Sequence, residues 1–201
     1  MLNFKQNSTK LAIVLGEYLV ASLYGMYSHV SVTTAGDLIF DTYFTMVRDA
    51  IEMSLKHTLL RFNKLSDLVV YDRPQFRVRF TVNYVLTNPL RELKLRYRYF
   101  ADAYYTIAPS LATVISATAW AEREAMDLFG VKFAGHPDLR RILGDYGLFG
   151  FPGRKDFPLV GQFSYFYSLN FLRVFRIKGT LQDFWSLYFQ KKIYAKIVRS
   201  A

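Results

Sequence analysis

The sequence predicts an α/β (α+β) fold in which helices pack against a small mixed or antiparallel sheet, followed by a long extended C-terminal segment. Two neighbouring stretches, 76–86 and 92–99, alternate apolar and polar residues with the period of a half-buried strand. Three stretches, 9–27, 43–61 and 110–129, place apolar residues at helical spacing. Beyond them, glycine and proline interrupt every regular pattern in a run too apolar and aromatic for a disordered chain.

Composition bounds the class of protein. The 201 residues suit one domain, and 52% apolar with 21% charged residues is enough for a sizeable core. Aromatic residues make up 17%, more than such a core needs, which indicates either an exposed interface or the codon bias of an AT-rich genome. The absence of cysteine excludes disulfides and Cys-ligated zinc or iron–sulfur sites.

The charge is strongly and unevenly basic. The formal net charge is +10. Residues 61–100 carry nine Lys and Arg against three acids, and residues 171–201 carry seven against one. This balance predicts an acidic partner, which could be a nucleic acid, an anionic membrane surface or an acidic protein face.

The first predicted element is a helix over 9–27, capped by Thr9. Its run from Leu11 to Val30 is apolar enough to suggest a transmembrane span. Glu17 near the middle would cost about 2–3 kcal/mol at the bilayer centre, so we favour a packed helix and expect no transmembrane span.

Two short strands, 29–34 and 38–41, are predicted to form a hairpin. Asp41 or Thr42 then caps a helix over 43–61. The apolar face of this helix comprises Phe44, Val47, Ile51, Leu55 and Leu59.

After a buried strand at 68–71, the alternating stretches form an antiparallel pair over 76–99. The inward residues are Phe76, Val78, Phe80, Val82, Tyr84 and Leu86 on the first strand, and Leu93, Leu95, Tyr97 and Tyr99 on the second. The outward face is a basic stripe of Arg77, Arg79, Lys94, Arg96 and Arg98. It is either a solvated sheet face or a platform for an acidic partner. RNA stacking is disfavoured, because the aromatic residues face the opposite way.

Two more helices are expected, one over 110–117 and one capped by Thr118 that ends at Gly130. Glu122 and Glu124 are placed in the first turn of the second helix, where a carboxylate is worth about 0.3–1 kcal/mol.

Arg123 and Asp127, four residues apart on this predicted helix, are expected to form an ion pair.

Charged residues continue past this helix among Leu, Ile, Phe and Pro, as an interface segment requires. We therefore predict twelve interface or segment-anchoring residues: Glu122, Arg123, Glu124, Asp127, His136, Asp138, Arg140, Arg141, Asp145, Arg154, Lys155 and Asp156.

No nucleophile lies near a base at a recognisable spacing, the three histidines lack metal-ligand spacing, and no glycine-rich phosphate loop is present. The sequence thus predicts no catalytic, cofactor-binding or metal-binding residue.

The run from 120 to 161 resembles the 30-kDa subunit family of respiratory complex I, the proton-pumping NADH:quinone oxidoreductase. The matching residues are Trp120, Glu122–Glu124, Asp127, Phe129 and Gly130, then His136–Leu143 and Asp145–Gly147, then Arg154–Leu159 and Gly161. The chain departs from the family at Gly150-Phe151-Pro152, where Gly-His-Pro is usual, and in its basic aromatic tail.

The resemblance implies a core scaffold subunit of the hydrophilic arm, on the matrix side of the mitochondrial inner membrane. It implies packing against the 49-kDa subunit that helps form the quinone site, with neighbouring hydrophilic-arm subunits as further partners. This chain would bind no cofactor and have no active site, while FMN, iron–sulfur clusters, NADH and ubiquinone belong to other subunits. Composition and the lack of an import presequence suggest a divergent, organelle-encoded member.

The expected organisation is an α/β domain at 1–130, an extended motif-bearing interface segment at 131–170 that wraps the partner, and a basic aromatic tail at 171–201. The tail fits an amphipathic helix that docks on a lineage-specific subunit or lies on a membrane surface; we favour the subunit. A basic RNA-binding or mitochondrial ribosomal protein is the alternative function. A free soluble enzyme would need a self-contained pocket that the sequence does not indicate.

Overall fold

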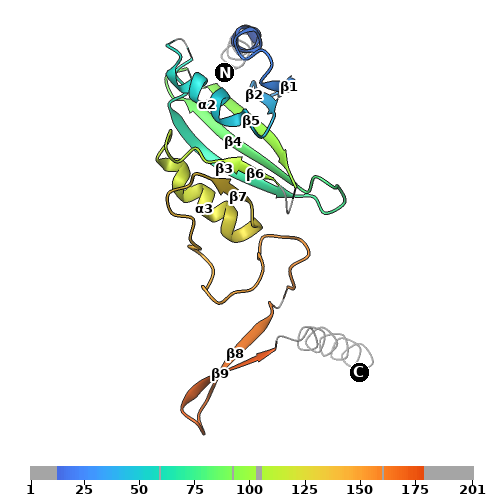
Figure 1. Ribbon diagram of the computed structural model, residues 1–201, viewed down its shortest axis with the longest axis vertical. Coiled ribbons are helices and arrows are strands. Elements are labelled where there is room, and N and C mark those ends of the chain that lie inside the picture. The colour runs from blue at the N-terminus through green and yellow to red at the C-terminus, as the bar shows by residue number, and fades with distance from the viewer. Residues whose placement is uncertain (1–12, 59, 92, 103–105, 160, 179–201) are drawn as a thin grey trace, which may run out of the picture. The chain divides into compact units, whose positions relative to one another are not determined.

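The computed structural model describes residues 13–178, apart from 59, 92, 103–105 and 160. The chain divides into two compact units, residues 1–155 and residues 156–201. The first unit contains a five-stranded sheet and the helices that pack on it (Figure 1).

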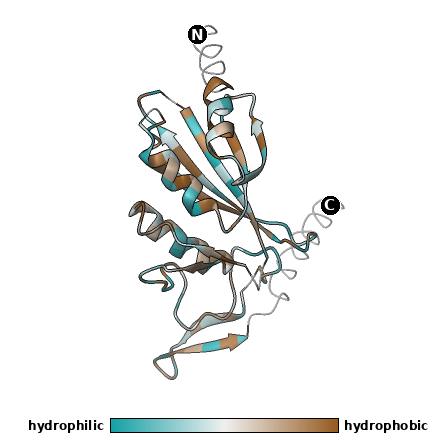
Figure 2. Ribbon diagram, turned by 45° about the horizontal axis from the view of Figure 1, so that its top comes forward, coloured by the Kyte–Doolittle hydropathy of each residue, from teal (hydrophilic) through white to brown (hydrophobic). Residues whose placement is uncertain are grey.

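The sheet is mixed, as predicted. Its strands are β1 (Tyr27–Val32), β2 (Leu38–Thr42), β3 (Lys64–Asp72), β4 (Phe80–Asn88) and β5 (Leu93–Ala101). They lie in the order β1-β2-β5-β4-β3, with β2 parallel to β5 and every other neighbouring pair antiparallel. The alternation of apolar and polar residues along the strands can be followed in Figure 2.

One face of the sheet forms the core. Phe80, Tyr84, Tyr97 and Tyr99 are fully buried on this inner face, with the shorter apolar side chains of β4 and β5 between them. A sheet that stacks nucleic-acid bases needs exposed aromatic residues, and these rings are inside. The RNA-binding alternative therefore has no support from the sheet.

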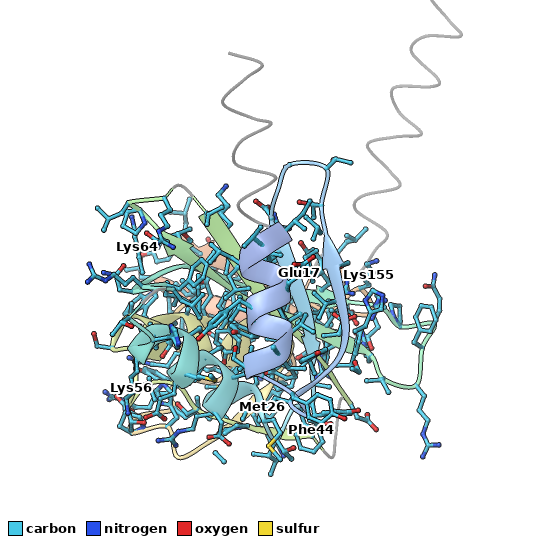
Figure 3. All side chains as sticks on the ribbon, turned by 90° about the horizontal axis from the view of Figure 1, so that it is seen from above. Glu17, Met26, Phe44, Lys56, Lys64 and Lys155 are labelled. Atoms are coloured by element: carbon cyan, nitrogen blue, oxygen red, sulfur yellow. The ribbon has the colours of Figure 1, made fainter. Side chains whose placement is uncertain are left out.

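Helices cover the inner face. A helix described over 13–22 lies on the β1–β2 side, and Figure 3 shows Glu17 on it and Lys56 on the next helix, α2 (Val47–Lys56). The helix α3 (Ala117–Phe129) packs beside β3. Among the residues that the structure describes, no helix is long and apolar enough to cross a membrane.

Helix α2 is shorter than the predicted 43–61. Asp41 and Thr42 belong to β2 and do not cap it, because Asp41 is held in the sheet by an ion pair with Arg98. Val47 and Ile51 are buried as expected, whereas Phe44 lies before the helix and is exposed.

Two strand expectations were wrong in their bounds. Residues 76–79 are a loop, closed by a hydrogen bond from Arg73 N to Arg79 O, so Phe76 and Val78 are exposed and Arg77 lies off the sheet. The strand at 68–71 is part of the edge strand β3, which is only partly buried.

The predicted helix at 110–117 is a set of turns, because Ser110 and Leu111 bind the carboxylate of Glu122 instead of continuing a helix. Gly130 ends α3 in the left-handed conformation, as expected, with φ 77°.

The rest of the first unit is mostly loop. The strands β6 (Ile107–Pro109) and β7 (Lys132–Ala134) form a short parallel pair that the sequence did not predict, and residues 135–155 follow without helix or strand. In the second unit, β8 (Phe163–Ser168) and β9 (Arg173–Lys178) form an antiparallel hairpin, also unpredicted. The helix expected in the tail lies outside the described residues.

Candidate functional site

The motif-bearing loop is anchored to α3 by one buried carboxylate, that of Asp127. Its Oδ2 accepts the backbone N–H groups of Ile142, Leu143 and Gly144 at 3.1, 2.8 and 2.8 Å. Its Oδ1 accepts a hydrogen bond from Arg141 Nη1 at 2.8 Å. Burial alone would raise the pKa of Asp127, but these four donors hold the pKa below its usual value. The loop therefore closes around an ionised side chain.

Arg141 extends this anchor. Its other terminal nitrogen, Nη2, donates to Gly150 O at 2.8 Å, and its guanidinium lies 5.4 Å from the centre of the Phe151 ring. The Arg141 side chain thus binds both Asp127 on α3 and Gly150, so it connects the two ends of residues 141–150 with the helix. Arg141 thus has the segment-anchoring role that was one of the two expected for it.

A second anchor lies at the C-terminal end of α3. Arg154 Nε donates to Phe129 O at 2.6 Å, and its guanidinium stacks 4.4 Å from the Phe151 ring. Gly153 N donates to Leu128 O at 2.8 Å. The ring of Phe151 lies so close to Gly130 that a Cβ there would come within 2.6 Å of it. Phe151, where the family usually has histidine, thus packs between two arginines and the end of the helix.

The loop ends against the sheet. Lys155 contributes its backbone N–H rather than its ammonium group, donating to Asp72 Oδ2 at 2.7 Å. Arg79 binds both oxygens of the same carboxylate, at 2.5 and 2.7 Å. Asp72 and Arg79 were not among the predicted residues. Arg79 was predicted only as part of the outward basic stripe, whereas its side chain is 15% exposed and pairs with Asp72.

Glu122 is the centre of a buried polar cluster between α3 and the sheet. Its side chain is fully buried and accepts hydrogen bonds from Ser110 Oγ at 2.5 Å, Leu111 N at 2.8 Å and Tyr84 Oη at 3.2 Å. Burial raises the pKa of Glu122, and these bonds only partly offset it. The contacts of Ser110 and Tyr84 with Glu122 were not predicted, because each residue is distant from Glu122 in sequence.

His136 fixes the start of the loop. Its Nδ1 accepts Asp138 N–H at 3.1 Å, and its Nε2 lies 3.0 Å from Ala119 O. Since an N–H only donates and a carbonyl only accepts, the imidazole is neutral with its proton on Nε2. The side chain is 1% exposed, with Glu122 Oε2 at 4.0 Å. His136 therefore joins the loop to the first turn of α3 from inside the molecule.

The helix positions correct two expectations. Glu122 and Glu124 lie in the middle of α3, which starts at Ala117 and has no acidic residue in its first turn, so the expected dipole interaction is wrong. The expected Arg123–Asp127 ion pair is also wrong: Arg123 Nε donates to Arg140 O at 3.2 Å, and Asp127 pairs with Arg141.

The remaining predicted residues are nearer the surface. Arg140 and Asp138 form an exposed pair with two bonds of 2.7 Å, which lowers the pKa of Asp138 through the Arg140 hydrogen bond. Glu124 and Asp145 are exposed, and Asp156 begins the second unit. The structure thus brings Asp127 and Arg141 together, and Glu122 and His136, but leaves the exposed Glu124 and Asp145 outside these clusters.

The anchored loop presents apolar side chains outward. Leu143, Tyr146 and Phe149 are 59%, 80% and 69% exposed, although the backbone beside them is held by Asp127 and Arg141. Trp120 on α3 is also exposed, with Arg123 stacked on its ring. We call Leu143, Tyr146 and Phe149 the loop knob. Among the described residues, no group of three or more His, Asp or Glu side chains could hold a metal ion.

Comparison with known proteins gives a consistent family. The family described as "Respiratory-chain NADH dehydrogenase, 30 Kd subunit" matches residues 44–163. NADH-ubiquinone oxidoreductase subunit 9 of Reclinomonas americana is 37% identical over 157 residues, covering 78% of this chain and 76% of that protein. An NADH-quinone oxidoreductase subunit from Rhizobium johnstonii is 40% identical over 156 residues, covering 76% of this chain and 74% of that protein.

A solved structure resembles the fold. It is that of the membrane-bound sulfane sulfur reductase, an archaeal respiratory membrane complex, with a TM-score of 0.62 and 22% identity over 73% of this chain and 85% of that chain. At this identity the likeness concerns the fold alone. The family match covers more than half of the sequence and includes the whole of the anchored loop, residues 135–155. The chain therefore belongs to the 30-kDa subunit family of the respiratory-chain NADH dehydrogenase.

Proposed function

We propose that this chain is a non-catalytic scaffold subunit in the hydrophilic arm of respiratory complex I. It takes part in electron transfer from NADH to ubiquinone by packing against the 49-kDa subunit on the matrix side of the mitochondrial inner membrane. FMN, the iron–sulfur clusters and the quinone site belong to other subunits. Family membership supports the complex, and the geometry of the loop supports the role.

The observation that carries the proposal is the loop knob. Exposed apolar residues on a mobile loop would lose conformational entropy on docking. Here the backbone is held at 142–144 by the Asp127 carboxylate and at Gly150 by Arg141, and the knob residues lie at or between these points. Aromatic side chains on a preformed surface are typical of interface hot spots. The knob therefore suits a permanent subunit interface.

The use of the charged residues argues for a scaffold rather than an active site. Both buried carboxylates of α3 accept several hydrogen bonds from the chain's own donors. His136 uses both ring nitrogens on backbone groups. A catalytic acid or base needs a proton site that substrate can reach. Asp127 and His136 are occupied in holding the loop, and Glu122 in holding the turn at Ser110 and Leu111.

The hairpin of the second unit supports the proposal that the C-terminal segment wraps around a partner. A two-stranded hairpin is marginally stable alone in water. Here it exposes Tyr165, Phe171, Leu172 and Val174. Its three cations, Arg173, Arg176 and Lys178, have no acidic residue beside them within 163–178. An apolar partner surface edged with carboxylates would cover it.

The test is assembly of the complex in cells that carry only the variant chain. The double variant Tyr146→Ala, Phe149→Ala should lower the amount of assembled complex I several-fold, because about 1–2 kcal/mol or more is expected from each buried aromatic anchor. NADH:ubiquinone turnover per assembled complex should not change. Tyr24→Ala is the control, since Tyr24 is an 88% exposed aromatic residue outside the loop. Normal assembly with lost turnover would overturn the proposal.

The partner is tested separately. A photoreactive side chain at position 146 should cross-link to the 49-kDa subunit in the purified complex. Cross-links that reach only some other subunit would contradict the proposed partner while leaving the scaffold role intact.

A further inference from the structure

The outer face of the sheet, opposite the helices, contains a hollow of about 510 Å³. Its lining includes Thr81, Asn83 and Val85 of β4, together with Val69 of β3 and Ile39 of β2. Longer side chains form the walls: Arg73 and Tyr71 at one end, and Lys94, Arg96 and Arg98 along β5. The described helices pack on the other face, so this surface is left to solvent in the isolated first unit.

The hollow is lined by four cations and one acid, Asp67. Two of the cations are neutralised within the chain: Arg96 pairs with Asp37, and Arg98 binds Asp41 through two hydrogen bonds of 2.5 and 2.7 Å. Arg73 and Lys94 have no acidic partner among the described residues. The uncompensated positive charge therefore lies at these two positions.

The Arg73 side chain is fixed by contacts within the chain. Its guanidinium lies between the rings of Phe76 and Phe100, 5.2 and 5.4 Å from their centres, and its Nη2 donates to Thr81 Oγ1. Its Nε is buried without an acceptor in the described structure, as is that of Arg96. A carboxylate docked in the hollow would give the Arg73 guanidinium the acidic partner that it lacks among the described residues.

The spacing of the two free cations suggests the shape of the occupant. Arg73 stacks on Phe100, which lies six residues from Lys94 along β5, about 20 Å at roughly 3.3 Å per residue. Between them, β4 contributes two polar side chains, Thr81 and Asn83, and one apolar side chain, Val85, to the lining of the hollow. An extended segment of about six residues spans that length.

We propose that this hollow is a docking site for an extended acidic segment of another subunit of the complex, with one carboxylate on Arg73 and another beside Lys94. The site lies on the face opposite α3 and is thus separate from the loop knob. It rests on the proposed function only in requiring that the chain be part of a multisubunit assembly. A protein segment fits better than a lipid, because Thr81 and Asn83 on β4 and the cations on β5 distribute polar groups along the whole hollow.

The test uses the intact complex, purified through a tag on a different subunit. Mass spectrometry first establishes that the chain is present; its absence would contradict the proposed function and not the site. A carbodiimide that joins lysine to carboxylate without a spacer is then applied. Lys94 should be linked to an Asp or Glu of another subunit. Acetylation of Lys94 should be slower in the complex than in the urea-dissociated chain by about tenfold, which corresponds to about 1.4 kcal/mol.

A matched pair of variants tests the other end. Arg73→Gln should reduce the Lys94 cross-link several-fold, whereas Arg77→Gln, an exposed cation on the same loop but outside the hollow, should not. Equal acetylation of Lys94 in the complex and the dissociated chain would overturn the proposal. So would protection that gives no protein cross-link and disappears on delipidation, since a lipid would then be the occupant.

Discussion

Two fully buried carboxylates on α3, five residues apart, are stabilised in opposite ways. Asp127 accepts three backbone N–H groups and a guanidinium, so its ionised form is favoured. Glu122 receives two hydroxyl groups and one backbone N–H with no direct cation, so burial dominates and its neutral form is favoured. The same helix therefore contributes two acids with opposite effects on the pH dependence of stability.

Asp127→Asn should destabilise the purified chain by about 3 kcal/mol at pH 7, because Arg141 loses its buried counter-charge. The pKa of Asp127 is lowered on folding, so its contribution is present above the unfolded pKa of about 4 and is lost as the pH falls through the lower folded value. The difference between wild type and variant, from urea unfolding, should thus shrink below about pH 4. A difference independent of pH would contradict the ionised anchor.

Glu122→Gln should show the opposite trend. The pKa of Glu122 is raised on folding, so its contribution is present below the unfolded pKa of about 4.3 and is lost as the pH rises through the folded value. Relative to the Gln variant, the wild type should therefore lose unfolding free energy as the pH rises above about 4.3. Urea titrations at several pH values measure this slope. A flat difference would mean that the Glu122 pKa is not raised.

At the scale of elements, the close approach of the loop to the end of α3 depends on glycine. Gly130 and Gly135 both have φ of 77°, a left-handed conformation that costs a residue with a Cβ roughly 1–2 kcal/mol. A Cβ at Gly135 meets nothing within 4 Å, whereas one at Gly130 would come within 2.6 Å of Phe151 and 2.7 Å of Arg154. The two positions share backbone strain and differ in space.

Gly135→Ala should therefore cost only the strain of about 1 kcal/mol. Gly130→Ala should cost distinctly more and should also displace Phe151 and Arg154 from the helix end. Thermal or urea unfolding of the two variants, compared side by side, checks this. Equal losses at both positions would contradict the packing of Phe151 on Gly130.

The elements that sequence predicted are those with local signals. The alternation over 80–86 and 93–99 and the glycine at 130 each encode their structure in neighbouring residues, and β4, β5 and the end of α3 agree. The turns at 110–117 and the ends of α2 depend on distant residues, Glu122 and Arg98. Helical periodicity could not reveal these because a tertiary hydrogen bond outweighs a few tenths of a kcal/mol of propensity.

The same division holds for the candidate site. The motif residues were predicted as interface or segment-anchoring residues, with no choice made between the two roles. The structure uses Asp127, Arg141, Arg154 and His136 within the chain. Sequence could not distinguish these roles, since intrachain and interchain charges have the same composition. Leu143, Tyr146 and Phe149 face outward, but none of them was among the predicted interface residues.

At the scale of the whole molecule, the buried apolar residues of the described chain all lie between Leu19 and Phe133. The second unit contributes none of them. The free energy of folding should therefore come from the first unit, because burial of apolar surface is the dominant favourable contribution.

A chain truncated after Lys155 should unfold cooperatively, with an unfolding free energy within about 1 kcal/mol of the full chain. The truncated chain should be more soluble than the full chain, because the exposed apolar residues of the hairpin are removed. It should incorporate poorly into complex I. Urea unfolding followed by circular dichroism, and native electrophoresis of the assembled complex, measure the two properties. Loss of the cooperative transition would show that the second unit is needed for the fold.

The Asp127 anchor has a consequence for how the surface of this subunit can change during evolution. Its carboxylate binds the peptide N–H groups of residues 142–144 and not their side chains. Any residue except proline offers that N–H, so the outward side chains can be exchanged as a partner's surface drifts while the path of the loop is kept. Gly144 is more restricted, because a Cβ there would lie 3.1 Å from Asp127 Oδ1 and the carboxylate would have to shift by a few tenths of an ångström.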